Sequence, residues 1–287
     1  MWLIDYEGYT KLKNILIAGA GSYIGESFKD YLGQWSDEYK VTTIGTKGLK
    51  PEKEMFEGID AIFCVAGIAH IKETKENRHL YFDVNRDLVV QIARAAKEAS
   101  VHQFILLSSM SVYGLETGRI TKKTEPKPVT AYGESKLQAD VEIQKIEDEG
   151  FLFTCLRPPM VYGKNCTGNY QALRKFALES PVFPDYQNQR SMIYIGNLCE
   201  FVKEAIDQEK SGLFFPQNGE YTNTSMMVRE IAEIHGKKLR LTKAFNWAVK
   251  IAPMNVVKKV FDDLVYEKID TVDKYGLIES IRLTEKI

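Results

Sequence analysis

The 287-residue sequence contains only four cysteines, and none of them forms a C-x-x-C pair. We therefore expect no disulfide framework and no metal site. The net charge is −1 at pH 7, so bulk electrostatics predict neither a nucleic-acid nor a membrane partner. No apolar stretch reaches the ~18 residues of a membrane span, and the first residues lack the features of a signal peptide. These absences favour a cytoplasmic globular protein.

A glycine-rich segment near the N-terminus is typical of a dinucleotide-binding turn. Residues 13–19 form an apolar run, Gly19, Gly21 and Gly25 follow, and residues 26–32 have helical character. Strand, glycine turn and helix in this order are the context that such a turn requires. Glycines allow the backbone to approach a pyrophosphate, and the helix N-terminus offers free N–H groups to the anion. The alternative is an ordinary glycine-rich connection between a strand and a helix.

Tyr132 and Lys136 stand four residues apart, a spacing that on a helix places both side chains on one face. An ammonium beside a phenol lowers the phenol pKa from its usual value of about 10. We therefore expect Tyr132 to exchange a proton with a substrate alcohol or carbonyl, and Lys136 to lower the pKa of Tyr132. The upstream segment 107–114 is rich in hydroxyl groups, and a serine there could bond the same substrate oxygen.

Together these motifs resemble the extended short-chain dehydrogenase/reductase family, which contains nucleotide-sugar epimerases, dehydratases and ketoreductases. The family usually has G-x-x-G-x-x-G in its first turn, and Ser22 stands here at the middle glycine. Further matching segments follow in the family's order at residues 60–70, 84–85, 104–114, 156–163 and 189–197. The resemblance extends over residues 13–235.

The resemblance implies roles for individual residues. Tyr132, Lys136 and Ser109 are the implied catalytic residues, with Ser108 as the alternative to Ser109, because strand alternation directs only one of the two toward the site. Arg190 is implied to bind the substrate diphosphate, unless it is an ordinary surface arginine. The implied substrate-binding residues are Ser109, Ser111, Asn165, Asn169, Tyr170 and Arg190. The implied cofactor-binding residues are Gly19, Gly21, Ser22, Tyr23, Ile24, Gly25, Lys47, Asp60, Ala61, Val65, Ala66, Gly67, Tyr132, Lys136 and Pro158.

Strands and helices alternate to about residue 160, which predicts an α/β fold with a Rossmann-type, doubly wound parallel sheet. The second strand, at 39–44, is followed by a short connection to the strand after Asp60, so we expect this edge of the fold to be pared down. The predicted dinucleotide-binding domain covers residues 1–160. Residues 161–287 are predicted to form a smaller substrate-binding lobe, some segments of which could return to the first domain. Residues 242–266 have the periodicity of an amphipathic helix.

The end of the second strand bears on the choice of cofactor. NAD-preferring enzymes of this fold place Asp or Glu there to bond the ribose 2′-hydroxyl. Residues 44–47 contain no carboxylate, but they include Lys47, which would attract a 2′-phosphate. The sequence therefore favours NADP(H) over NAD(H), and the alternative is that Lys47 is a solvated loop residue. Asp60 is implied to lie near the adenine, or else it caps the turn before its strand.

The implied reaction is hydride transfer between a nicotinamide and C4 of a nucleotide-activated hexose, coupled to proton transfer through Tyr132. Dehydratases of the family have an acidic pair after the active-site hydroxyl, where this chain has Met110 and Ser111, so dehydration is disfavoured. A 4-ketoreductase acting on a UDP-sugar in surface polysaccharide synthesis is favoured over a UDP-sugar 4-epimerase with tightly bound NAD. A non-catalytic NADP-binding sensor is the distant alternative.

The resemblance also implies a homodimer, formed through the helices near 85–99 and 132–148. Val89, Ile92, Leu137 and Val141 could contribute to such an interface. The same apolar positions would equally suit the core of a single subunit.

Overall fold

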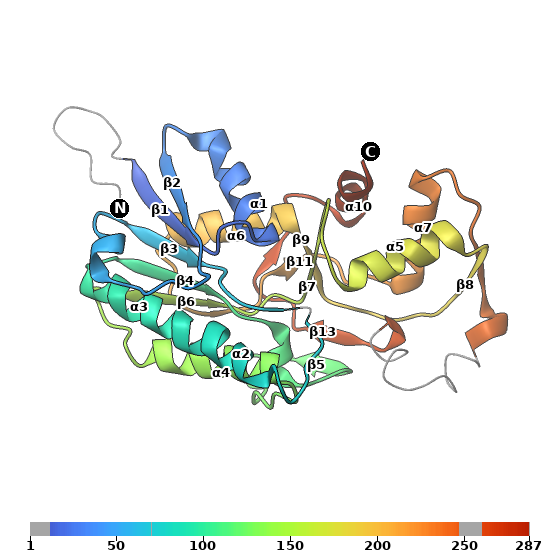
Figure 1. Cartoon of the computed structure of the whole chain (residues 1–287). Coiled ribbons are helices and arrows are strands. Elements are labelled where there is room, and N and C mark those ends of the chain that lie inside the picture. Colours follow the sequence, from blue (N-terminus) through green and yellow to red (C-terminus); the bar gives the residue numbers. More distant parts are fainter. Residues whose placement is uncertain (1–11, 70, 247–259, 287) are drawn as a thin grey trace. The chain divides into compact units, whose positions relative to one another are not determined.

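The computed structural model describes residues 12–69, 71–246 and 260–286 (Figure 1). The chain forms two compact units. The first contains the chain up to Val112, Pro128–Arg157 and Phe201–Phe214, and the second contains Tyr113–Lys127, Pro158–Glu200 and the chain from Phe215 onward. The chain thus crosses between the units at several points. One of these crossings, between Arg157 and Pro158, lies close to the predicted boundary at residue 160.

A six-stranded parallel sheet forms the centre of the first unit, in the order β10-β6-β4-β3-β1-β2. The predicted α/β fold with a Rossmann-type parallel sheet is therefore confirmed. β2 ends the sheet, and only the short 3-10 helix η2 (Lys53–Phe56) lies between β2 and β3, so this edge is pared down as expected. The strands are β1 (Lys13–Ala18), β2 (Tyr39–Ile44), β3 (Ala61–Cys64), β4 (Gln103–Leu107), β6 (Leu152–Leu156) and β10 (Gly212–Phe214).

Helices cover both faces of this sheet. In Figure 1, α1 and the part of α6 from Phe201 onward lie on one face, and α3 and α4 lie on the other. β3 and β4 are buried along their whole length, as expected for strands covered on both sides. The helices are α1 (Tyr23–Leu32), α2 (Arg78–Phe82), α3 (Val89–Glu98), α4 (Ala131–Gln144) and α6 (Ile195–Asp207), with the 3-10 turns η1 (Gly33–Trp35) and η4 (Met110–Tyr113). A π-helical turn, η3 (Asp83–Leu88), joins α2 to α3.

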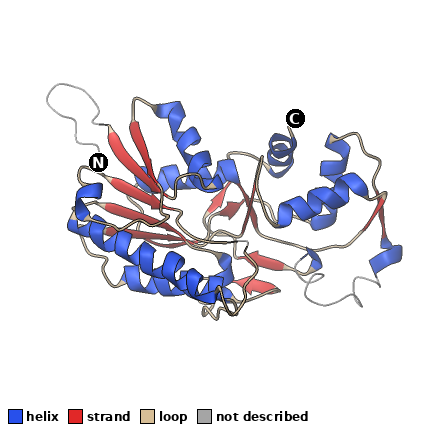
Figure 2. Ribbon diagram, viewed as in Figure 1, coloured by secondary structure: helices blue, strands red, loops and turns tan. Residues whose placement is uncertain are grey.

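The second unit contains short strands that pair two by two (Figure 2). The pairs are β5 with β13, β7 with β9, β8 with β12, and β11 with β14. Their bounds are β5 (Gly118–Ile120), β7 (Met160–Tyr162), β8 (Val182–Pro184), β9 (Met192–Tyr194), β11 (Gln217–Asn218), β12 (Arg240–Thr242), β13 (Leu264–Tyr266) and β14 (Thr271–Val272). The helices α5 (Asn169–Glu179), α7 (Thr224–Ile234) and α10 (Leu277–Glu285) accompany them.

The helix expected over residues 242–266 lies mostly outside the described residues. The ends that are described belong to β12, to the 3-10 turn η5 (Lys243–Phe245) and to β13. Asn246, Val260 and Phe261, which border the undescribed stretch, are helical, so the helix prediction is wrong only for the outer residues at 242–245 and 262–266.

Candidate active site

The glycine turn connects β1 to α1 and is shaped for close approach. Gly19 has a φ of 128°, and a Cβ there would lie 2.8 Å from the Val65 side chain, so only glycine fits. Gly21 has a φ of 76° with open space above it. Ser22, at the position of the family's middle glycine, has ordinary extended dihedrals, and its hydroxyl accepts a hydrogen bond from Gly25 N at 3.2 Å. Ser22 therefore acts as the N-cap of α1 and keeps the turn intact.

The same unit contains a cavity of about 530 Å³. It is lined by Thr46, Lys47, Gly48, Leu49, Gly67, Ile68, Asp83, Val84, Leu88 and Gln91. Lys47 and Gly67, two of the predicted cofactor-binding residues, both line this cavity. Asp83 also lines the cavity, and the pattern at the end of the second strand did not predict a carboxylate there.

Asp60 and Ala61 lie at the opposite end of the sheet from the glycine turn. Asp60 Oδ2 accepts a hydrogen bond from Asn14 N at 2.7 Å, and Ala61 is the first residue of β3. The turn follows the carboxyl end of β1, and a strand rises about 3.3 Å per residue, so the separation is roughly 13 Å. The predicted cofactor contacts of Asp60 and Ala61 are therefore wrong, and Asp60 caps the start of its strand. Val65, Ala66 and Gly67 follow β3 at the correct end.

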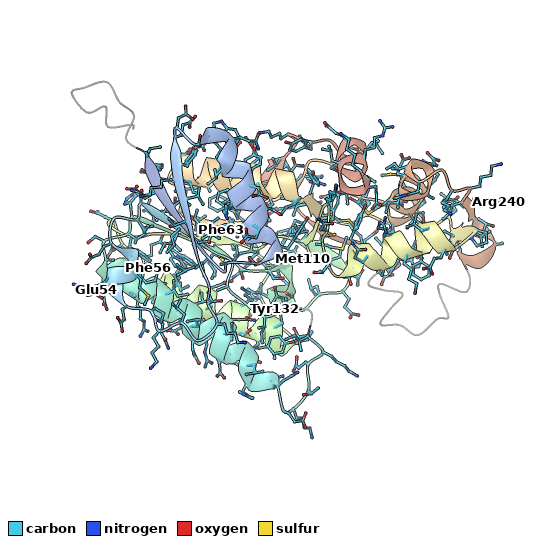
Figure 3. The ribbon with its side chains drawn as sticks, turned by 45° about the horizontal axis from the view of Figure 1, so that its top comes forward. Glu54, Phe56, Phe63, Met110, Tyr132 and Arg240 are labelled. Atoms are coloured by element: carbon cyan, nitrogen blue, oxygen red, sulfur yellow. The ribbon has the colours of Figure 1, made fainter. Side chains whose placement is uncertain are left out.

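Tyr132 lies in the first turn of α4. Met110, labelled with it in Figure 3, belongs to the hydroxyl-rich segment 107–114 that precedes this helix in the sequence. The Ser109 side chain lowers the pKa of the Tyr132 phenol through a hydrogen-bonding interaction, so the two hydroxyls are neighbours. Ser109 is partly exposed, whereas Ser108 is buried with a relative exposure of 3%, so Ser109 is the serine available to a substrate. Ser109 Oγ in turn lies 2.6 Å from Ser111 Oγ. The three predicted catalytic residues therefore occur in one unit, with Lys136 one turn along the same helix face.

The electrostatics of Tyr132 differ from the expectation. Burial raises the pKa of Tyr132, and its hydrogen bond with Ser109 only partly opposes this. Lys136 is buried, and its ammonium donates to Leu107 O at 2.9 Å and to Ala66 O at 3.2 Å. Because the ammonium is directed at these carbonyls, the expected lowering of the Tyr132 pKa by Lys136 is wrong for the protein alone. Burial lowers the pKa of Lys136 itself.

The start of α4 packs closely on the hydroxyl-rich segment. A Cβ on Gly133 would lie 2.6 Å from Ser111 O, so a side chain there would push the two elements apart. Thr130 caps the helix by accepting from Gly133 N at 3.1 Å. Together these contacts fix the position of Tyr132 relative to Ser109.

Asn85 is a structural part of the site to which the sequence reasoning assigned no role. It is fully buried in η3, accepts from Ile68 N at 2.7 Å and donates to Ser135 Oγ at 3.2 Å. Asn85 thereby ties the loop after β3 to the helix of Tyr132. The available signal was its place in segment 84–85, one of the segments that match the family's order.

Comparison with known proteins agrees with this geometry. Residues 15–214 match the model of the NAD dependent epimerase/dehydratase family. The chain belongs to this family. It is 28% identical over 247 residues to a UDP-glucose 4-epimerase from Vibrio cholerae, covering 77% of this chain and 75% of the relative. It is also 26% identical over 246 residues to an N-acetyl-alpha-D-glucosaminyl-diphospho-ditrans,octacis-undecaprenol 4-epimerase from Escherichia coli O157:H7, covering 79% of this chain and 73% of the relative.

Solved structures share the fold of this family member. A UDP-glucuronic acid 4-epimerase from Bacillus cereus aligns with a TM-score of 0.73 at 17% identity, covering 95% of each chain. A dTDP-4-dehydrorhamnose reductase from Clostridium acetobutylicum aligns with a TM-score of 0.73 at 16% identity, covering 94% of this chain and 98% of the other. The resemblance to extended short-chain dehydrogenases/reductases is therefore confirmed, and this family member is an NAD(P)-dependent enzyme.

The predicted substrate-binding residues other than Ser109 and Ser111 lie in the second unit. Asn165, with a φ of 64°, and Asn169 are exposed. Tyr170 is 1% exposed, and its hydroxyl donates to Glu285 at 2.8 Å, so Tyr170 is a core residue rather than a ligand contact. Arg190 is partly buried, and its Nη1 donates to Asp262 O at 2.8 Å. Pro158, predicted as a cofactor contact, begins a segment of the same unit.

Neither a metal-binding cluster nor a membrane-spanning helix occurs among the described residues. Within residues 12–69, 71–246 and 260–286, no group of three or more His, Cys, Asp or Glu side chains is placed to hold a metal ion. Across the same ranges, no helix combines the length and the apolar character needed to cross a membrane. The four cysteines are buried as free thiols.

Proposed function

We propose that this enzyme is an NADP(H)-dependent 4-ketoreductase that acts on a UDP-activated hexose in surface polysaccharide synthesis. The observation that carries the proposal is the pairing of Ser109 with Tyr132, one helical turn from Lys136, at the carboxyl ends of β3 and β4. When bound, the nicotinamide cofactor supplies the hydride that C4 of the sugar receives. The residues of the chain must then orient the carbonyl and deliver one proton.

In the proposed reaction, the hydroxyls of Ser109 and Tyr132 both donate hydrogen bonds to the C4 carbonyl oxygen. As the carbon gains a hydride, Tyr132 transfers its proton to this oxygen, which becomes the product alcohol. Burial raises the pKa of Tyr132, so the phenol is protonated at neutral pH, as a proton donor must be. Lys136, one helical turn from Tyr132, is proposed to bind the nicotinamide ribose when the cofactor is present. After this transfer, the Ser109–Ser111 hydroxyl pair offers a route by which a proton can return to Tyr132.

The cofactor part of the proposal rests on the glycine turn and on Lys47. The turn has the tight backbone approach and the capped helix N-terminus that a pyrophosphate requires. Lys47 lines the 530 Å³ cavity beyond β2, where a lysine favours a 2′-phosphate. Gly19, Gly21, Ser22, Tyr23, Ile24, Gly25, Val65, Ala66, Gly67, Lys136 and Pro158 complete the proposed cofactor-binding set. A reductase must release its oxidised cofactor after each turnover. The proposed NADP(H) is therefore expected to exchange with solution.

Substrate recognition is proposed for Arg190, Asn165 and Asn169 of the second unit. The Arg190 guanidinium suits a diphosphate, which it could bind with two parallel hydrogen bonds. Replacing Arg190 with Met would test this role, because the KM for the UDP-sugar should rise while the KM for NADPH stays unchanged.

The reductase is tested by mixing the purified protein with a UDP-4-keto-hexose and NADPH. We expect loss of NADPH absorbance and formation of one UDP-hexose, with NADH clearly less effective. No NADPH consumption with any UDP-4-keto-hexose tried would contradict the proposal.

A 4-epimerase is the second candidate, because both curated relatives described above are named 4-epimerases. It would oxidise C4, rotate the keto-sugar and reduce its other face. Incubation with UDP-glucose alone separates the two candidates. UDP-galactose formed without added cofactor, together with NAD retained through purification, would select the epimerase.

A homodimer through α3 and α4 is also proposed. A groove of about 590 Å³ runs between these helices, and its lining includes Leu137 and Val141, of which Val141 is 48% exposed. Val89 and Ile92 are fully buried in the core of the unit, so their predicted part in the interface is wrong. Replacing Val141 with Glu should convert the dimer to a monomer in light scattering after size-exclusion chromatography. A wild-type protein that is already monomeric would exclude the dimer.

A further inference from the structure

Asp140 is a buried carboxylate for which the reaction described above has no use. It lies on α4, one turn beyond Lys136 and two turns beyond Tyr132, so the three side chains share one helix face. Its relative exposure is 4%, although aspartate is rarely buried without a partner. A charge held at this depth beside the reacting groups requires an explanation.

The contacts of Asp140 lead to the ends of two central strands. Oδ2 accepts a hydrogen bond from Ser108 Oγ at 2.9 Å and another from Arg157 Nε at 3.0 Å. Ser108 N donates to Leu156 O at 2.7 Å, and Arg157 N donates to Phe214 O at 3.0 Å. One carboxylate oxygen thus joins α4 to the carboxyl ends of β4 and β6.

Three consecutive residues at the end of β4 bind three residues of one face of α4. Leu107 O accepts from Lys136, Ser108 donates to Asp140, and Ser109 is hydrogen-bonded to Tyr132. The Ser108–Asp140 bond therefore lies beside the two contacts that position the proposed chemistry. A shift of this strand end relative to the helix would move Ser109 away from Tyr132.

Stability alone does not account for the pair that Asp140 forms with Arg157. A buried ion pair gains little net stability over apolar residues of similar volume, because both charges lose their hydration. In the part of the chain that the structure describes, Asp140 Oδ1 has no hydrogen-bond partner of its own, and burial raises the pKa of Asp140, although Arg157, Ser108 and the Cys155 thiol oppose this. This incomplete satisfaction favours a role in geometry and charge over one in stability.

We propose that Asp140 is a positioning residue of the ketoreductase, holding Ser109 and Tyr132 on the same substrate oxygen through Ser108 and supporting the charge of Lys136. This inference rests on the proposed function, because it assigns a task within the same site. Asp140 raises the pKa of both Lys136 and Tyr132. The other groups that face these two side chains are Cys64 of β3, Cys155 of β6, Tyr81 of α2 and Ser109.

The direction of the pH effect follows from the sign of the charge. Removing the Asp140 anion lowers the pKa of Lys136 and of Tyr132, so both groups lose their protons at lower pH. The fall of kcat on the alkaline side should therefore move to lower pH. A role in stability alone would not shift this limb.

The test compares Asp140→Asn with Asp207→Asn. Asp207 also bonds a lysine and a tyrosine in this unit, with its side chain 21% exposed, but it lies in α6 and not in the site. For Asp140→Asn we expect a drop in kcat of about 10- to 100-fold, KM values for NADPH and sugar within about twofold, and the alkaline limb shifted to lower pH. Asp207→Asn should change none of these. Ser108→Ala should lower kcat without shifting the limb, because the Asp140 charge remains.

A double variant guards against misfolding, since Asp140→Asn leaves Arg157 buried without its anion. Asp140→Leu with Arg157→Met removes both charges and should fold, yet it should keep the low kcat. Wild-type kcat in this double variant, or in a folded Asp140→Asn protein, would overturn the inference.

An ultraviolet difference titration of the Tyr132 phenol, against a Tyr132→Phe background, needs no turnover. The phenol should titrate at lower pH in Asp140→Asn, and an unchanged or higher value would overturn the inference. If the wild-type protein turns over no UDP-4-keto-hexose, the proposed function fails, and this titration still decides the role of Asp140.

Discussion

The two units build their interiors in different ways. The first rests on a ladder of parallel strands whose buried side chains are mostly apolar, and its core includes Phe104, Leu106 and Phe153. The second has strand pairs of only two or three residues, and side-chain amides connect them. Backbone ladders depend little on residue identity, whereas each amide in the second unit binds particular partners.

Asn218 illustrates the second kind of construction. It is 3% exposed; its Oδ1 accepts from Tyr194 N at 3.0 Å and from Asn197 Nδ2 at 2.9 Å, and its Nδ2 donates to Tyr162 at 3.1 Å. One side chain thus links β7, β9, α6 and β11. The difference between the units teaches that the proposed chemistry sits on a scaffold tolerant of substitution, while the proposed substrate loops depend on single polar residues.

The largest expected effect is on chemistry in the first unit, with its scaffold unchanged. Replacing Tyr132 with Phe removes the proton donor, and we expect ketoreductase kcat to fall by about 10²- to 10⁴-fold. Steady-state kinetics would measure this loss, and circular dichroism would show an unchanged fold. Tyr81→Phe is the matched control, because its ring lies 6.5 Å from that of Tyr132 and its hydroxyl donates to Ile71 O. Equal losses in both variants would contradict the assignment.

The next effect is on stability in the second unit. Asn218→Ala removes one hydrogen bond each from Tyr194 N, Asn197 Nδ2 and the Tyr162 hydroxyl, and we expect a loss of about 2–3 kcal/mol in unfolding free energy. Urea denaturation would measure it. Asn169→Ala, at an exposed position, should cost almost nothing. A stability change of the same size in both variants would remove the contrast between the units.

A smaller effect is expected at the cofactor cavity. Lys47→Ala should weaken NADPH binding by about tenfold, or roughly 1.4 kcal/mol, and leave NADH binding unchanged, because only NADPH carries the 2′-phosphate. Fluorescence titration would measure both affinities. Lys50, exposed in the same loop and absent from the cavity lining, provides the control variant Lys50→Ala. Equal weakening of NADH would mean that Lys47 acts on another part of the cofactor.

The smallest effect concerns the glycine turn. Glu26 Oε1 accepts a hydrogen bond from Gly21 N at 2.9 Å, so a carboxylate lies where the proposed site receives an anionic pyrophosphate. Glu26→Gln should tighten cofactor binding by about threefold at low salt, because one repulsive charge is removed. The gain should shrink as salt rises. Asp30→Asn, further along the same helix, is the control, and weaker binding by Glu26→Gln would contradict the repulsion.

The first unit was largely predictable from the sequence. Its apolar runs, the glycine turn and the Tyr132–Lys136 spacing are local patterns, and each maps onto a strand, a turn or a helix face. Asp60 was misplaced because it precedes β3 and lies beside the start of β1, at the end of the sheet opposite the glycine turn. The raised pKa of Tyr132 was also missed, because it arises from burial, which the Tyr132–Lys136 spacing does not reveal.

The second unit could not be predicted in the same way. Strands such as Met192–Tyr194 are too short for periodicity to identify, and the partners of Asn218 lie far away in the sequence. Tyr170 was predicted to bind substrate, but its hydroxyl bonds Glu285, which is 115 positions away in the sequence. Long-range polar contacts of this kind leave no local pattern.

The junction between β4 and α4 has a consequence for how this protein can change during evolution. Because Leu107, Ser108 and Ser109 each bind a different residue of α4, a substitution at one position alters one contact. A single-residue insertion or deletion in this stretch would reassign all three contacts at once and turn the buried serine toward the site. We therefore expect homologues to vary in length in the loops of the second unit. We expect no insertion or deletion between β4 and the two residues Ser108 and Ser109.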